Sequence, residues 1–265
     1  MENNAIFSCI DAYTAAFAEV EKGEGCIRFR DDALPDMYDH NFTVIQAGTP
    51  LEACGEMIQK ELAERKAEGK AFYQVNMRLP RYEQAERAFF QAAFPLKPDV
   101  TQYVNCVSDA PKSLHLAGRE DCIVRRVNAP AIAQHRTQIE LAAYSESYGA
   151  DFCRRKGERN ALVYIPEGGV DSYVGYVGEK PVGKADLLVH EGVAMIEDFD
   201  VHPSVQRQGF GTAILRELVK QALHQGAKTV FMVTDADDTA KDMYTKLGFK
   251  QIPGRLSAFF GLAGA

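Results

Sequence analysis

The stretch Gln206-Arg-Gln-Gly-Phe-Gly211 joins two strongly patterned segments of the chain. Before it, residues 192–201 are rich in β-branched and apolar side chains and predict a strand. That strand should end at His202-Pro203, because proline cannot donate a hydrogen bond to a strand ladder. After the turn, residues 212–224 carry apolar side chains at helical spacing, which predicts an amphipathic helix ending at Gly226. The order strand, glycine turn, helix decides the fold.

The glycine turn has the chemistry of an anion site. Glycines let backbone N–H groups approach a ligand, and the helix that follows adds unpaired N–H donors with a partial positive charge. The turn therefore predicts a pyrophosphate site, with Arg207 as an extra cation. Two other phosphate loops are excluded: a dinucleotide fingerprint needs glycine where Ile214 stands, and a P-loop needs lysine where Thr212 stands. A plain tight connection is the alternative reading.

The surrounding patterns predict a mixed α/β sheet from residue 121 onward. Its expected order is strand, helices, three strands in succession, helix, strand, helix and strand. Besides the strand and helix that flank the turn, the expected segments are strand 122–127, helix 130–148, the hairpin strands 172–177 and 182–189, strand 228–234, helix 239–247 and the extended region 249–260.

The first half of the chain carries a fainter copy of this order. Residues 68–76 are similar to residues 226–234, and each segment lies between two helix-like segments. This favours an internal duplication, with two unrelated α/β domains as the alternative. Residues 107–121 are polar and rich in turn formers, and they are the predicted linker. The predicted domains are residues 1–110 and 120–265.

Composition excludes several classes of protein. The 265 residues are 46% hydrophobic and 25% charged, which is typical of globular proteins. A net charge of −7 argues against nucleic-acid binding that is independent of sequence. No apolar stretch approaches the ~18 residues of a membrane span, and the first residues predict no secretory signal. The six scattered cysteines then predict reduced thiols in a cytoplasmic protein, and the dispersed histidines predict no metal site.

Two motifs in this order resemble the GNAT N-acyltransferase superfamily. The phosphate-loop motif is matched by Gln206, Gly209 and Gly211, and the late-helix motif by Ala240, Tyr244, Gly248 and Phe249. The resemblance covers roughly residues 122–265, and Asp237 stands where the family often has asparagine. It implies tandem GNAT folds. Residues 1–106 then form a degenerate GNAT-like domain without cofactor binding, since Gln46-Ala-Gly-Thr-Pro-Leu-Glu-Ala53 lacks Gly-x-Gly.

The resemblance implies an N-acetyltransferase that moves an acetyl group from acetyl-CoA directly to a primary amine in a ternary complex. The acceptor would be a small molecule or a peptide, and a homodimer is one expectation for the assembly. A non-catalytic acyl-CoA-binding regulatory protein and a transferase of longer acyl groups are the alternatives. The implied cofactor-binding residues are Phe199, Val201, Gln206, Arg207, Gln208, Gly209, Phe210, Gly211, Thr212 and Asp237.

The expected catalytic groups lie on the strand and on the late helix. Tyr244 is the candidate general acid for the CoA thiolate, with simple packing as its alternative role. Strict alternation would point Met195, Glu197, Phe199 and Val201 to one face, so Glu197 is the leading general base, directly or through a water. Asp198 is the second candidate, because a β-bulge would switch the faces. His202 is a third candidate.

The acidic run Asp235-Ala-Asp-Asp238 follows a predicted strand and precedes a predicted helix. Capping of the helix N-terminus is its first reading. Attraction of a cationic amine substrate is the second reading. A divalent metal site is the third, because the run lacks the glutamate and glycine of a calcium loop.

Overall fold

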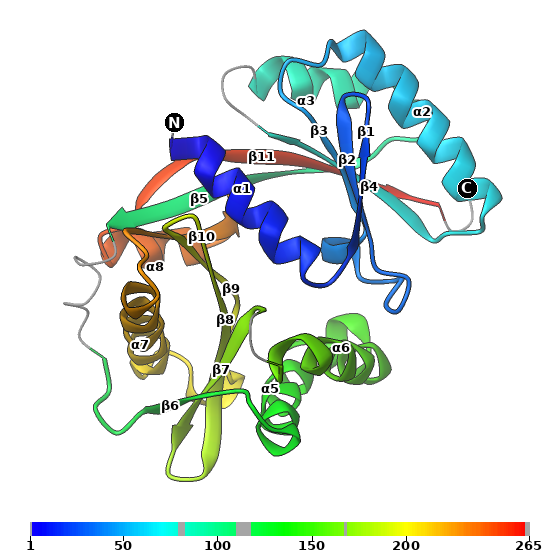
Figure 1. The fold of residues 1–265 in the computed structure, drawn as a ribbon. Helices are drawn as coiled ribbons and strands as arrows, with labels where there is room; N and C mark the ends of the chain where they lie inside the picture. The colour runs from blue at the N-terminus through cyan, green and yellow to red at the C-terminus, as the bar shows by residue number, and fades with distance from the viewer. Residues whose placement is uncertain (1, 79–82, 110–117, 167–168, 263–265) are drawn as a thin grey trace. The chain divides into compact units, whose positions relative to one another are not determined.

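The chain folds into two compact units, which Figure 1 shows in one view. This computed structural model describes residues 2–78, 83–109, 118–166 and 169–262. The first unit contains the described residues of 1–17, 107–232 and 244–250, and the second unit contains those of 18–106, 233–243 and 251–265. Both units combine strands with helices, which confirms the predicted mixed α/β class.

The first unit is built on a mixed sheet with the strand order β6-β7-β8-β9-β10. Its strands are β6 (Ile123–Arg126), β7 (Asp171–Val177), β8 (Lys180–His190), β9 (Val193–Val201) and β10 (Thr229–Asp235). Neighbours from β6 to β9 are antiparallel, while β9 and β10 are parallel. The hairpin and the flanking strands agree closely with the predicted ranges.

Helices cover both faces of this sheet (Figure 1). They are α5 (Pro130–Tyr148), α6 (Ala150–Tyr164) and α7 (Phe210–His224), with α8 (Ala240–Lys246) after β10. Two neighbours on β8 show the layering. A Cβ on Gly183 would lie 2.5 Å from Ile214 Cδ1 of α7, whereas Lys184 Nζ lies 2.8 Å from Glu140 Oε2 of α5. Helices α5 and α7 therefore pack on opposite faces of the sheet.

The N-terminal helix α1 (Glu2–Ala15) also belongs to the first unit. It packs against β8 and β9, where the Cys9 thiol lies 3.6 Å from the Val193 carbonyl oxygen. The Tyr13 hydroxyl donates to Asp186 Oδ2 at 2.8 Å. The sequence patterns predicted nothing for this helix, because its partners lie more than 170 residues away in the chain.

Loss of the Tyr13 hydroxyl should weaken the docking of α1. Tyr13→Phe removes a donor from the buried Asp186 carboxylate, and a hydrogen bond to a charged group contributes about 2 kcal/mol. We expect a loss of about that size in the free energy of unfolding, measured by urea denaturation. The half-exposed Tyr148 provides the control, and Tyr148→Phe should change stability by less than about 0.5 kcal/mol. Equal losses in both variants would contradict the assignment.

The second unit has the strand order β1-β2-β3-β4-β11-β5. Its strands are β1 (Glu19–Gly23), β2 (Cys26–Arg30), β3 (Phe42–Ile45), β4 (Phe72–Arg78), β5 (Asp99–Asp109) and β11 (Lys250–Gly261), and its helices are the short η1 (Tyr38–His40), α2 (Leu51–Ala67) and α3 (Glu83–Ala92). One core joins α2, β4, the end of α3 and β11, with Ile58, Val75, Phe90 and Phe260 fully buried.

The C-terminal strand of the chain lies in the second unit. β11 pairs antiparallel with β4, from Arg255 opposite Arg78 to Gly261 opposite Phe72. The predicted division into residues 1–110 and 120–265 stays a prediction, and the two units draw their terminal segments from across it. Strand β5 runs to Asp109, so the first residues of the predicted linker are strand, while residues 110–117 lie outside the described residues.

Among the described residues, none of the helices combines the length and the hydrophobicity that a bilayer crossing requires. Five of the six cysteines are buried, in agreement with their expected behaviour as small hydrophobic residues.

Candidate functional site

Strand β9 is paired with its parallel neighbour β10 only over its first residues. The two strands are in register from Val193 opposite Thr229 to Met195 opposite Phe231. β9 then continues to Val201, and within the described strands no further β9 residue is registered with β10. From Phe199 to Val201 the β9 backbone therefore has no registered partner in β10, and an extended ligand could bind along it as an added strand does.

A β-bulge interrupts the same stretch of β9 on its other side. Asp186 of β8 faces Glu197, but Lys184 faces Asp200, so two residues of β9 lie opposite the single residue Ala185. Asp198 has φ +48°, a left-handed conformation that is uncommon outside glycine. The extra residue bends β9 and redirects the side chains that follow it.

The bulge overturns the strict alternation expected along β9. A Cβ on Gly211 would lie 3.3 Å from Val201 Cγ2 and 3.4 Å from Phe199 Cζ, so these two side chains face the start of α7. Glu197 lies opposite Asp186, which contacts α5 and α6, and directly opposed residues share a face. Glu197 therefore does not share the face of Phe199 and Val201 as the alternation predicted.

The glycine turn presents backbone amides at the start of α7. Arg207 has φ +61° and Gly209 has φ +87°, and residues 206–209 are exposed. Gly209 is the N-cap residue and supplies no side-chain cap. The N–H groups of the first helical turn, from Phe210 to Thr212, have no acceptor within the helix. The side-chain amide of Gln206 donates from Nε2 to the Val201 carbonyl oxygen at 3.1 Å, which connects the turn to the end of β9.

A second cation lies beside the turn. The Arg119 guanidinium stacks over the Phe210 ring at 4.6 Å and pairs with both carboxylate oxygens of Asp121, at 2.7 and 2.5 Å. Arg119 Cγ is 3.4 Å from the Cβ position of Gly209. The sequence analysis missed this residue because it assigned residues 107–121 to a linker.

Helix α8 carries the second predicted motif. Tyr244 is buried, and its ring centroid lies 6.2 Å from that of Phe249. The Asp238 carboxylate accepts from the Ala240 N–H at 3.1 Å at the start of α8, which confirms the capping role predicted for the acidic run. Asp237 belongs to the second unit, where its N–H donates to Asp235 Oδ1 at 2.8 Å, and its predicted cofactor role stays a prediction.

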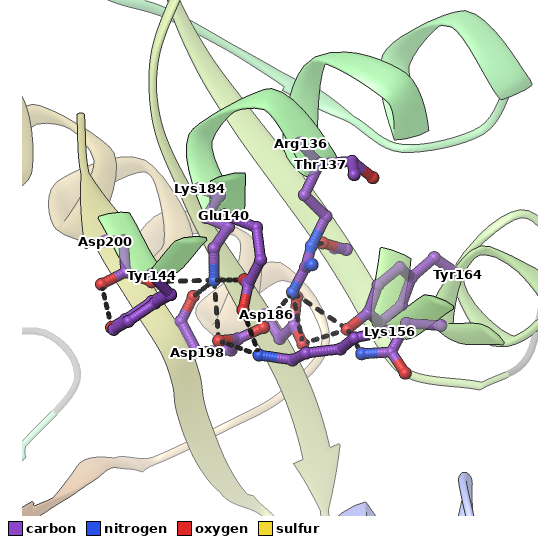
Figure 2. A network of polar contacts seen from close by, with 12 residues as sticks. Arg136, Thr137, Glu140, Tyr144, Lys156, Tyr164, Lys184, Asp186, Asp198 and Asp200 are labelled. Carbon is purple, nitrogen blue, oxygen red and sulfur yellow. Dashed lines mark hydrogen bonds and ion pairs between the residues drawn. The ribbon is translucent and has the colours of Figure 1, made fainter. Parts of the chain in front are cut away.

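A buried network of ion pairs lies under the bulge, between β8, β9, α5 and α6 (Figure 2). Its cations are Arg136, Lys156 and Lys184, and its anions are Glu140, Asp186, Asp198 and Asp200. Three tyrosine hydroxyls complete it: those of Tyr13 and Tyr164 donate to Asp186, and that of Tyr144 donates to Asp200. The sequence carried a signal for this network, because Lys184 and Asp186 alternate with apolar residues inside a strand.

The cations of this network keep the Asp198 carboxylate ionised. Burial raises the pKa of its carboxyl, but Lys156, Lys184 and Arg136 lower that pKa more, so it lies well below its usual value. Asp198 is therefore ionised at neutral pH and holds three cations. Such a carboxylate is a weak proton acceptor.

Three carboxylates of the network, those of Glu140, Asp198 and Asp200, have oxygens within 4.8 Å of one another, as a divalent metal would require. The Lys184 ammonium lies among them, 2.7 to 2.8 Å from one oxygen of each. A side-chain cation thus already occupies the centre of this group.

The second unit has no equivalent site among its described residues. Strand β3 ends at Ile45, which is still registered with Met77 of β4, so no part of β3 extends beyond its neighbour. The loop before α2 folds back, with the Gln46 N–H donating to the Gly25 carbonyl oxygen at 2.9 Å. The predicted loss of cofactor binding in the first half is consistent with both features and stays a prediction.

The first unit thus combines a parallel strand pair that separates, a bulged strand and an amide-rich turn at a helix N-terminus. The Acetyltransferase (GNAT) family model matches residues 129–249. A curated relative, the uncharacterized N-acetyltransferase CgeE of Bacillus subtilis (strain 168), is 30% identical over 73 residues. That match is 27% of this chain and 28% of the relative, so the chain spans less than a third of it.

Two solved structures resemble the whole chain. The GCN5-related N-acetyltransferase from Kribbella flavida has a TM-score of 0.69 at 16% identity, covering 99% of this chain and 96% of its own. A tandem GNAT protein from the clavulanic acid biosynthesis pathway has a TM-score of 0.59 at 10% identity, covering 91% and 79%.

Residues 129–249 match the GNAT acetyltransferase family model, and the chain has the fold of tandem GNAT proteins. Both the predicted family and the predicted fold are confirmed. The individual site roles stay predictions. The structure brings Phe199 and Val201 to Gly211 and to the start of α7, and it sets Glu197, Asp198 and Asp200 on the opposite face of the sheet.

Proposed function

We propose that this protein is an N-acetyltransferase that uses acetyl-CoA and a primary amine of a small molecule or peptide. The end of β9 from Phe199 to Val201, which is not registered with β10 and leads to the exposed turn before α7, carries this proposal. Members of the GNAT family use acetyl-CoA. The N–H groups from Arg207 to Thr212 would bind the pyrophosphate, and the Arg207 side chain would add a positive charge.

The pantetheine arm would lie along β9 beside Phe199 and Val201. Backbone groups from Phe199 to Val201 would form hydrogen bonds with it as a strand does with its neighbour. The arm would then bring the thioester to the bulge, where a backbone N–H near Val201 would stabilise the developing oxyanion.

Acyl transfer would be direct, in a ternary complex. The amine nitrogen attacks the thioester carbonyl carbon and loses one proton to a base, and the C–S bond then breaks. Tyr244 would give its phenolic proton to the leaving thiolate. Glu197 is the first candidate base, directly or through a water, with Asp198 second and His202 third, although Glu197 lies on the face opposite Phe199 and Val201. The low pKa of Asp198 in its ion pairs makes its carboxylate a weak proton acceptor, which counts against this second candidate.

A thiol-release assay tests the proposal. Purified protein is incubated with acetyl-CoA and a panel of amines, polyamines, amino acids and aminoglycosides, and melting is followed with and without acetyl-CoA. We expect a higher melting temperature with acetyl-CoA, since a ligand stabilises the state that binds it, and amine-dependent thiol release. Binding without release across the panel would favour an acyl-CoA-binding regulatory protein. Absence of binding would overturn the proposal.

A further inference from the structure

Lys184 is completely buried on β8, next to Ala185, which lies opposite the bulge of β9. It contacts four oxygens: Asp198 Oδ1 at 2.7 Å, Glu140 Oε2 and Asp200 Oδ2 at 2.8 Å each, and the backbone carbonyl oxygen of Asp198 at 3.1 Å. Figure 2 shows this ammonium at the centre of the network. The contacts with the two Asp198 oxygens are hydrogen bonds, and those with Glu140 and Asp200 are ion pairs without hydrogen-bond geometry.

Two of these partners belong to the irregular segment of β9: Asp198 lies in the bulge, and Asp200 follows it. Asp198 is the residue in the left-handed conformation, and Lys184 holds both its side chain and its backbone carbonyl. Asp200 is the first registered residue after the bulge. Its carboxylate is held between Lys184 and the Tyr144 hydroxyl. A single cation therefore joins the two ends of the irregular segment.

The position of the charge is specific to Lys184. Lys156 also pairs with Glu140, at 2.7 Å, and with Asp198 Oδ1, at 3.2 Å, whereas Lys184 also contacts the Asp198 backbone and Asp200. Burial lowers the pKa of Lys184, yet the Asp198 and Asp200 carboxylates raise that pKa more, so the side chain is charged. A left-handed non-glycine residue persists where its surroundings hold it, and Lys184 supplies that restraint.

We propose that Lys184 is a positioning residue: its ammonium clamps the bulge and so sets the direction of the β9 backbone from Phe199 to Val201. This segment is the one along which the proposed function places the thioester arm, so the catalytic consequence rests on that function. The structural claim concerns the protein without ligand. Lys184 acts through the backbone and touches no reacting atom.

Two charge-matched double variants test the clamp. Lys184→Met with Asp200→Asn removes one positive and one negative charge, and leaves Glu140 and Asp198 paired with Lys156. Lys156→Met with Glu140→Gln removes the same charges from the other side of Asp198 and leaves Lys184 on the bulge. The two pairs are similar in burial, so a purely structural role predicts similar effects.

Amide hydrogen exchange of residues 198–201 in the ligand-free protein is the first measurement. We expect protection there to fall about tenfold or more in the Lys184/Asp200 variant and to stay near wild type in the Lys156/Glu140 variant. Equal protection in the two variants would overturn the clamp. If the first variant does not fold, Asp200→Asn alone cuts one end of the clamp, and unchanged exchange in that variant would also overturn it.

Acetyl-CoA affinity is the second measurement, made by calorimetry on the same proteins. The Lys184/Asp200 variant should bind at least about tenfold more weakly than the Lys156/Glu140 variant. A wild-type protein that does not bind acetyl-CoA would refute the proposed function but leave the exchange result standing. Changed exchange with equal affinity in the two variants would refute the link between the clamp and the cosubstrate.

Discussion

Gly209→Trp is expected to abolish acetyl-CoA binding, with a loss in affinity of about 1,000-fold, or about 4 kcal/mol. Gly209 lies where the backbone amides of the turn meet the start of α7. Glycine is the one amino acid without a side chain that would cover these amides. An indole side chain there would cover the N–H groups that are proposed to bind pyrophosphate. Isothermal titration calorimetry with acetyl-CoA measures the loss.

Gly48→Trp is the matched control for this variant. Gly48 has φ +89°, almost the same as the +87° of Gly209, and it lies in the loop before α2. Both substitutions therefore force a bulky residue into the left-handed region and should cost similar stability. Gly48→Trp should keep acetyl-CoA affinity within about twofold of wild type. Retained binding in Gly209→Trp would place the pyrophosphate site elsewhere.

Tyr244→Phe is expected to lower kcat about 100-fold while acetyl-CoA affinity stays within about twofold of wild type. The substitution removes the phenolic hydroxyl, whose proton is proposed to reach the leaving thiolate, and the ring keeps its packing beside Phe249. Steady-state thiol release gives kcat, and calorimetry gives the affinity.

A second buried tyrosine provides the control that distinguishes a catalytic role of the hydroxyl from a packing role. Tyr73 is 2% exposed and lies in the core of the second unit, whereas Tyr244 belongs to the first unit. Tyr73→Phe should lower stability without lowering kcat of the folded protein. If Tyr244→Phe turns over at the wild-type rate, Tyr244 has only a packing role and the acid must be sought among other groups.

Local patterns predicted the elements around the site closely. The strand, turn and helix over 192–224 follow from β-branched residues, glycines and apolar spacing, which are all read from neighbouring residues. The helix at 130–148 follows in the same way and has the predicted bounds. These features depend on interactions within one element, which the sequence displays directly.

The features that the sequence did not predict depend on distant partners. The bulge at Asp198, which the sequence analysis raised only as an alternative, inserts one residue into a run where acidic side chains occur at both parities, so alternation cannot reveal which face each takes. Lys184 and Asp186 are buried because Arg136 and Glu140 lie some 44 to 50 residues away and compensate their charges. The alternation of Lys184 and Asp186 with apolar residues is visible in the sequence, but a separation of this size leaves no periodic signal that identifies their partners.

The exchange of terminal segments has a consequence for the evolution of this chain. Helix α1 completes one unit and β11 completes the other, although each comes from the opposite end of the polypeptide. A gene split near residue 115 would yield two products. Each would lack a helix or strand of its own unit and would carry one that belongs to the other unit. Selection must therefore retain both halves together, even if only one of them has kept a working site.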